Sequence, residues 1–120
     1  MNEEEKKIVD KIVWLHEELC KLTYEGSKGA HGVGLPSIGH YIHYAEIIRE
    51  QVVYLFYDLH SNLLSKSNLL DLDEIFENEL RKLRIESKKM NEQKLIDRLE
   101  LITNLIGSAI TPLLKQRDNC

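Results

Sequence analysis

Hydrophobic residues recur along most of the chain with alternating spacings of three and four, the period of an amphipathic α-helix. The expected helices cover residues 3–25, 36 to about 65, 71 to about 86 and 91 to about 113 of the 120-residue chain. Because no strand pattern interrupts them and the connections are mostly short, we predict an all-α fold, an antiparallel four-helix bundle, in a single domain over residues 1–120. The expected core stripes are Ile8, Ile12, Leu15, Leu19 and Leu22; Tyr41, Ala45, Ile48, Val52, Leu55 and Leu59; Leu72, Phe76, Leu80 and Leu83; and Leu95, Leu99, Ile102, Ile106, Ala109 and Leu113.

Turn-forming and capping residues mark the expected ends of these helices. The glycines from Gly26 to Gly34 end the first helix, and a proline at position 36 suits the first turn of the second. The segment "SKSN" at residues 65–68 is expected to break the second helix. A capping box formed by Asp71 and Glu74 then opens the third helix. Asn91 is the expected N-cap of the fourth helix, and the proline at position 112 should kink or end it near its last turn.

The second helix is apolar or aromatic nearly all round. Ile47, Val53, Tyr54 and Tyr57 point away from its core stripe at about 100° per residue. In a four-helix bundle a spare apolar face is buried by another molecule, so we expect these four residues to form a homo-oligomer interface. The alternative is that the tyrosines are simply half-exposed, since each has a polar tip.

Composition narrows the class of protein. The chain is 42% hydrophobic and 30% charged, which is typical of a folded globular domain. Its net charge of −4 argues against nucleic acid as a partner, because a phosphate-backbone binder needs a basic face. No apolar run approaches the roughly 20 residues of a membrane span, and the start "MNEEEKK" has no signal-peptide core. We therefore expect a cytoplasmic protein with no membrane contact.

Catalytic and metal-binding sets are poorly represented. Cys20 is expected on the buried side of the first helix, with no serine, histidine and acid arranged for nucleophilic catalysis. His40, His43 and Glu46 follow one another at i, i+3 and i+6, but the Glu-x-x-His motif of metal-binding bundles is missing. We expect no catalytic residue, no metal and no cofactor, and keep a metal-dependent enzyme as a third alternative.

Residues 27–46, "SKGAHGVGLPSIGHYIHYAE", hold four of the six glycines and three of the five histidines. Lys-Gly stands at residues 28–29 and Gly-Leu at residues 34–35, and His43 and Glu46 follow Gly34 by nine and twelve residues. This order resembles the histidine-containing phosphotransfer (HPt) domains, which are helical bundles. The likeness covers about 20 of the 120 residues, with a gap of one residue.

The resemblance implies an inactive relative of that family. The phosphoacceptor position, three residues before Lys28, is Glu25, or Tyr24 when the gap is taken into account. Neither side chain forms the labile phosphoramidate that a histidine forms. The resemblance therefore implies a protein that docks on a receiver or a kinase without accepting phosphate.

The glycine-rich loop also suits an anionic ligand, because backbone N–H groups and the start of a helix attract phosphate. The alternative is an ordinary linker. Our first hypothesis is a non-enzymatic regulatory protein that self-associates and docks a protein partner; the second is an oligomer that sequesters a phosphorylated small molecule or nucleotide. The residues expected to form the binding surface are Lys28, His31, Ser37, His40, Tyr41, His43 and Tyr44.

Overall fold

A computed structural model describes the backbone of residues 1–27 and 38–118 and the side chains of residues 1–23 and 38–115. The predicted all-α class is confirmed, because the described residues form helices and short connections without a strand. The helices are α1 (Glu3–Ser27), α2 (Ile38–Val53), α3 (Lys66–Glu74), α4 (Arg81–Glu86), α5 (Glu92–Ala109) and α6 (Thr111–Asp118). Two π-helical segments, η2 (Tyr54–Asp58) and η3 (Ile75–Leu80), and one 3₁₀ turn, η4 (Ser87–Lys89), extend them.

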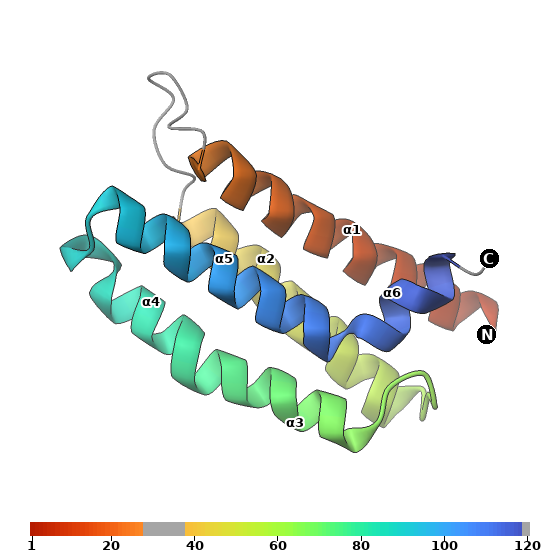
Figure 1. The fold of residues 1–120 in the computed structure, drawn as a ribbon. Coiled ribbons are helices and arrows are strands. Elements are labelled where there is room, and N and C mark those ends of the chain that lie inside the picture. The colour runs from red at the N-terminus through yellow and green to blue at the C-terminus, as the bar shows by residue number, and fades with distance from the viewer. Residues whose placement is uncertain (28–37, 119–120) are drawn as a thin grey trace.

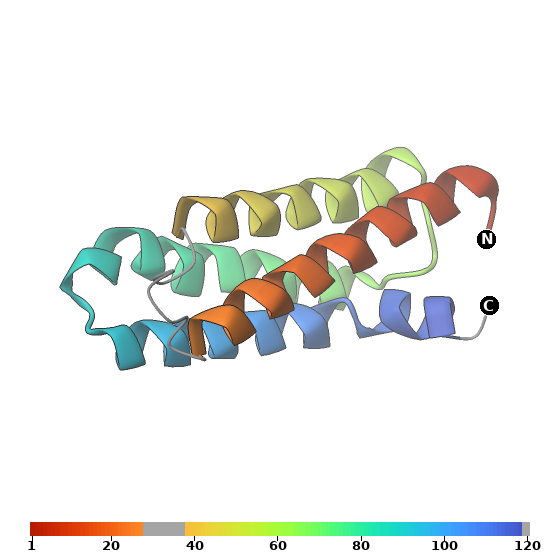
Figure 2. The ribbon, with the colours of Figure 1, turned by 90° about the horizontal axis from the view of Figure 1, so that it is seen from above.

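The helical segments lie side by side along one long axis (Figure 1). α3, η3 and α4 follow one another without a break, and η2 continues α2 in the same way. α1 packs against α2, α5 and α6, and α3 packs against both α2 and α5. Seen from above, α1 crosses obliquely over its neighbours (Figure 2). The beginning of α1 meets the end of the α2–η2 rod, as the contact of Glu4 with Tyr54 shows. The middle of α1 meets the first half of α2, as the contact of Trp14 with Tyr44 shows.

The predicted core stripes are confirmed with few exceptions. Most stripe residues are buried, and one hydrophobic cluster joins all the long helices. Leu22, Leu59 and Phe76 are partly buried residues at the edge of that cluster. The spacing of hydrophobic residues therefore predicts the buried faces of the helices well, because burial of apolar area is the dominant favourable term in folding.

Hydroxyl groups form a small polar network inside this core. Tyr41 Oη donates to the carbonyl of Leu99 at 3.1 Å and lies 2.7 Å from Thr103 Oγ1. Thr103 Oγ1 is 3.1 Å from Thr23 Oγ1, which donates to the carbonyl of Leu19 at 2.8 Å. The network joins α1, α2 and α5, so the three helices share a polar as well as an apolar contact.

The structure corrects the boundary between the second and third helices. The second helical rod ends at Asp58 rather than near residue 65, and His60 has a left-handed backbone with φ of 50°. The third begins at Lys66, where Ser65 is the N-cap and forms a capping box with Asn68. The segment "SKSN" therefore starts α3, and the box predicted at Asp71 is wrong because the helix is already under way there.

The start of the last expected helix agrees with the prediction, whereas its end lies earlier and a further helix follows it. Asn91 is the N-cap of α5, and its side chain accepts a hydrogen bond from the backbone N–H of Lys94. α5 ends at Ala109, and α6 restarts at Thr111 with Pro112 in its first turn. Proline is tolerated there because first-turn N–H groups have no partner within the helix. None of the helices in the described part of the chain is long and apolar enough to cross a membrane.

Candidate functional site

Of the predicted binding residues, four lie in the described structure, all at the start of α2. Lys28, His31 and Ser37 lie outside the described residues. His40 and His43 are exposed, Tyr44 is half-buried and Tyr41 is fully buried. The prediction for Tyr41 as a surface residue is therefore wrong, because its ring faces the core and its hydroxyl is held by Leu99 and Thr103. Burial raises the pKa of the Tyr41 phenol far above its ordinary value.

His40, His43 and Tyr44 join a tryptophan of α1 in a surface group, here called the aromatic cluster. Tyr44 is at its centre: its ring centroid lies 6.2 Å from that of Trp14, edge-on, and 6.2 Å from that of His43. The His40 ring is stacked on Tyr44 at 6.4 Å. Trp14 is 51% exposed, which is high for the largest apolar side chain. The cluster therefore offers a wide aromatic surface built from two helices.

The predicted oligomer interface divides into two parts. Ile47 and Val53 pack partly buried against the core, because α1 and α3 contact α2 on its flanks. Both keep some exposed surface, and their place in an oligomer interface stays a prediction. Tyr54 and Tyr57 are exposed, by 38% and 55% respectively. Tyr54 Oη donates a hydrogen bond to Glu4 Oε1 at 3.0 Å. Because only the neutral phenol can donate this bond, the bond raises the pKa of Tyr54.

Cys20 also departs from the prediction, since its side chain is exposed rather than buried. Its Sγ lies 4.0 Å from Nδ1 of His16, whose Nε2 is 3.3 Å from the carbonyl of Thr103. A carbonyl only accepts, so Nε2 carries the proton and Nδ1 faces the thiol. Partial burial, and then the charge of Glu17, raise the pKa of the Cys20 thiol. A raised pKa lowers the thiolate fraction, so this pair is poorly suited to nucleophilic chemistry.

Metal ligation has no support in the described residues, where no group of three or more His, Cys, Asp or Glu side chains is placed to hold an ion. Of the sequence candidates, His43 shares a hollow with Glu46. The carboxylate of Glu46, however, forms an ion pair with Arg84. A guanidinium at that carboxylate competes with any cation for the same oxygens.

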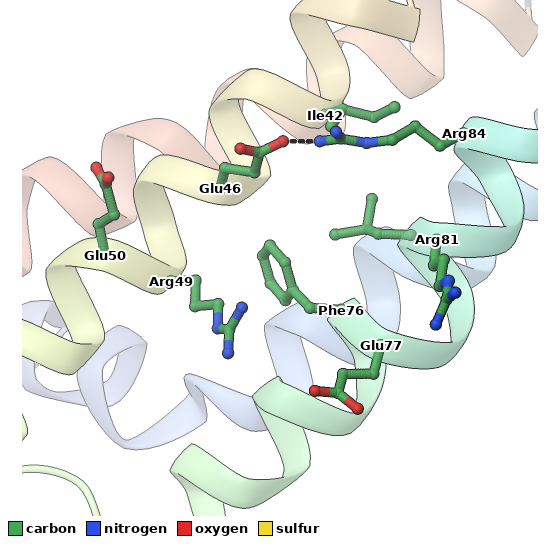
Figure 3. Close-up of a pocket in the computed structure, with 9 residues that line it drawn as sticks. Ile42, Glu46, Arg49, Glu50, Phe76, Glu77, Arg81 and Arg84 are labelled. Carbon is green, nitrogen blue, oxygen red and sulfur yellow. Dashed lines mark hydrogen bonds and ion pairs between the residues drawn. The ribbon is translucent and has the colours of Figure 1, made fainter.

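A groove of about 480 Å³ lies between α2 on one side and η3 with α4 on the other. We call it the arginine groove, because Arg49 lines it from α2 and Arg81 and Arg84 line it from α4. Figure 3 shows Arg84 extending across it toward Glu46, with Arg81 running along its own helix. Arg84 pairs with Glu46 across the groove. Arg49 Nε lies 2.9 Å from Oδ1 of Asp73, and its guanidinium carbon is 5.4 Å from the centre of the Phe76 ring. The two pairs tie α2 to the α3–η3–α4 rod.

The floor and rim of the arginine groove differ in character. Ile42, Phe76 and Leu80 supply the apolar part of the lining. Glu46, Glu50 and Glu77 supply the carboxylates, so that three arginines face three glutamates and the lining has no net charge. Phe76 and Leu80 belong to η3, and π-helical turns inside α-helices occur frequently at functional sites.

The arginine groove and the aromatic cluster are neighbours. A shallow hollow of about 300 Å³ is lined by Gly39 and His43 together with Ile42, Glu46 and Arg84. The last three residues also line the arginine groove, and His43 belongs to the aromatic cluster. The shallow hollow thus lies between the aromatic cluster and the arginine groove.

Sequence reasoning missed Trp14 and the arginines of the groove. Trp14 lies off the core stripe of the first helix, and a large aromatic residue at an outward position was the available signal. Arg81 and Arg84 are spaced i, i+3 on α4, but periodicity does not reveal which helix they face. With this geometry established, comparisons with known proteins add nothing further: no family model, curated protein or solved structure matches the chain.

Proposed function

We propose that this chain is a cytoplasmic, non-enzymatic binding protein that self-associates and docks a protein partner, built on an antiparallel four-helix bundle. Its working surface is the outer face of α1 and α2: the aromatic cluster of Trp14, His40, His43 and Tyr44, continued along the α2–η2 rod by the predicted interface residues Tyr54 and Tyr57. This face keeps three of the binding residues expected from the sequence and adds Trp14.

The observation that carries the proposal is the gathering of four aromatic rings at the surface, with Trp14 half exposed. Tyrosine and tryptophan, which supply two of these four rings, dominate the energy of many protein interfaces, because each buries about 150–250 Å². Scattered exposed hydrophobic residues need no explanation, whereas aromatic residues gathered from two helices mark a contact surface.

Self-association is tested with sedimentation velocity and native mass spectrometry of the full chain between about 1 and 100 µM, concentrations that bracket a micromolar dissociation constant. We expect oligomers whose population rises with concentration. Trp14→Ala and Tyr57→Ala should each shift the equilibrium toward the monomer. Ile85→Ala is the matched control, because Ile85 is 67% exposed but lies on α4, away from the proposed face.

A chain that stays monomeric over this range removes the self-association part of the proposal. The docking part is tested separately, by native mass spectrometry of the protein isolated from its own host. A co-purifying protein that is lost from Trp14→Ala but retained by Ile85→Ala supports docking at this face. Equal retention by both variants places the partner elsewhere and contradicts the proposal.

The resemblance to phosphotransfer domains stays a prediction about which partner docks. It favours a receiver domain or a kinase, and it predicts no acid-labile phosphate on the chain after incubation with a phosphorylated receiver. The alternative hypothesis, sequestration of a phosphorylated small molecule at the glycine-rich loop, falls on residues outside the described structure. Phosphohistidine on any residue of the chain would identify a true relay and overturn the docking-only role.

A further inference from the structure

We propose that the arginine groove is a second binding site, separate from the aromatic face, and that it takes a small organic anion. The ligand class is a molecule with one carboxylate, sulfonate or phosphate-ester group carrying a single negative charge, attached to a flat apolar body. At about 480 Å³ the groove is within the range of about 300–1,000 Å³ that small-molecule sites occupy.

The arginines have hydrogen-bonding capacity left over for such an anion. Arg81 makes no ion pair with any residue of the described part of the chain. Arg84 and Arg49 pair through one nitrogen each, Nη2 with Glu46 and Nε with Asp73. A guanidinium has five N–H donors in a planar fork that matches two oxygens of a carboxylate, sulfonate or phosphate. Arg81 and Arg84, three residues apart on α4, are neighbours on the helix surface, and both line the groove.

The floor fits the apolar part of the ligand. Ile42, Phe76 and Leu80 line the groove between the arginines. Arg49 covers one face of the Phe76 ring, with its guanidinium carbon 5.4 Å from the ring centre, and Ile42 and Leu80 supply the rest of the apolar wall. Figure 3 shows Phe76 in the middle of the groove, with Arg49 on one side and Arg81 on the other. A flat body can stack against this wall while its anionic group reaches α4.

The glutamates that line the groove limit the negative charge that a ligand can carry. Glu50 and Glu77 stand at the edge of the same groove and make no ion pair with any described residue. Their repulsion disfavours a multiply charged anion such as a triphosphate. Glu46 occupies a donor of Arg84 in the free protein, so an anion at Arg84 must compete with it. One negative charge, held by Arg81 or by Arg84 in competition with Glu46, meets less repulsion from the glutamates than several charges would.

The test uses 8-anilinonaphthalene-1-sulfonate, an aromatic anion whose fluorescence rises on leaving water, titrated into the full chain. We expect saturable binding with a dissociation constant below about 1 mM. Arg81→Glu should weaken it about tenfold, the cost of one charge-assisted hydrogen bond, and Arg81→Gln by less. Glu46→Gln should strengthen it, about threefold, because it frees Arg84 from its competitor. Benzoate should displace the dye, whereas benzamidine, of the same shape and opposite charge, should not.

Two controls make the result decisive. Trp14→Ala removes the ring that α1 contributes to the aromatic cluster and leaves Arg81 in place, so dye binding should be unchanged. Lys82→Glu applies the same charge reversal on α4 at a residue that does not line the groove, and should weaken binding less than Arg81→Glu. Dye binding that is absent up to about 1 mM, insensitive to Arg81→Glu, abolished by Trp14→Ala, or displaced by benzamidine overturns the proposal. None of these outcomes depends on self-association, so the two proposals fail separately.

Discussion

Tyr41 is buried, as its place in the core stripe predicts, and is therefore not part of the binding surface. Three hydroxyl groups, those of Tyr41, Thr103 and Thr23, share four contacts, two of them with backbone carbonyls. Three protons cannot fill four contacts at once, so one contact always lacks its proton. No buried side-chain polar atom in the described structure lacks a partner altogether. Every hydroxyl oxygen of the network therefore has a partner, but one of the four contacts has no hydrogen to share. The loss of one hydroxyl group should therefore cost little stability.

Tyr41→Phe is predicted to lower the free energy of unfolding by only about 1 kcal/mol, the net contribution of one hydrogen bond. Thr103 and Thr23 can still bond to each other after the change. Tyr41→Ala, in contrast, leaves a cavity and should cost about 3–5 kcal/mol. Urea denaturation followed by circular dichroism measures both, with the exposed Tyr57→Phe as the control that should change nothing. A loss from Tyr41→Phe as large as that from Tyr41→Ala would show that the polar network, not ring packing, stabilises this site.

Glu5 ties the start of α1 to the loop after η2. Its Oε2 accepts a hydrogen bond from Ser61 Oγ at 2.6 Å, and its Oε1 accepts from the backbone N–H of Asn2 at 3.1 Å. These bonds favour the carboxylate and lower the pKa of Glu5 below its ordinary value, the Ser61 bond being the larger cause.

Because the folded-state pKa of Glu5 is lowered, its contribution to stability is complete above the unfolded-state pKa near 4.5 and is lost as the pH falls through the folded-state pKa. Ser61→Ala should therefore lower the melting temperature at pH 7 but have a smaller effect at pH 2–3, about two units below the ordinary pKa of a glutamate carboxyl. Ser67→Ala is the control, since Ser67 is exposed and the hydrogen bonds of α3's cap come from Ser65. An equal loss at both pH values would mean that Ser61 acts without the charge of Glu5.

Between elements, α1 and α5 approach closely at Gly107. A Cβ added there would lie 2.9 Å from Nε2 of His16, which is closer than real Cβ atoms come to other groups. Glycine in a helix normally costs about 1 kcal/mol relative to alanine, so Gly107→Ala would stabilise an open helix. Here we expect Gly107→Ala to destabilise the folded protein instead, because the His16 imidazole must leave its contact with the Thr103 carbonyl.

A double-mutant cycle separates these two effects. Gly107→Ala should destabilise the parent chain by about 1–3 kcal/mol, the usual cost of overpacking. In the His16→Ala background the same change should become stabilising by up to about 1 kcal/mol, its intrinsic helix preference. Chemical denaturation of the four proteins gives the coupling. A Gly107→Ala effect of the same sign in both backgrounds would contradict the packing argument.

The start of α3 shows where local sequence rules reach their limit. Ser65 with Asn68, and Asp71 with Glu74, have the same spacing, and the second pair matches the usual acidic form of the capping box better. The first pair forms the cap because the connection after Asp58 is short and the chain re-enters a helix as soon as it turns. Ser65→Ala should cost about 0.5–2 kcal/mol, and Asp71→Ala less than about 0.5 kcal/mol. Thermal unfolding compares the two variants directly, and a larger loss from Asp71→Ala would refute the observed cap.

At the scale of the whole molecule, the sequence predicted the buried faces and the helical class better than the surface. Stripes such as Ile12 to Leu19 are local patterns, and burial follows from them directly. The aromatic cluster and the arginine groove arise from pairs far apart in the chain, such as Trp14 with Tyr44 and Arg49 with Phe76. Such pairs depend on which helices are neighbours and on how far one helix is shifted along the other. The spacing of hydrophobic residues in the sequence does not contain that information. Cys20 was misplaced for the same reason, because a neighbouring helix decides the exposure of residues beside the stripe. Tyr41, in contrast, lies on the core stripe and is buried as that stripe predicts, so only its place in the binding surface was wrong.

The fluorescence of Trp14 reports directly on self-association, because Trp14 is the chain's only tryptophan and belongs to the proposed interface. Its side chain is 51% exposed in the single chain, so its emission should be that of a partly hydrated indole. Self-association through the outer face of α1 and α2 would remove water from the ring. We therefore predict that the emission maximum moves to shorter wavelength, and that iodide quenching weakens, as the concentration rises from about 1 to 100 µM, the range around a micromolar dissociation constant. Tyr57→Ala should abolish this concentration dependence while leaving the dilute spectrum unchanged, and Ile85→Ala should leave both unchanged. An oligomer seen by sedimentation whose Trp14 emission does not move with concentration would assemble through another face.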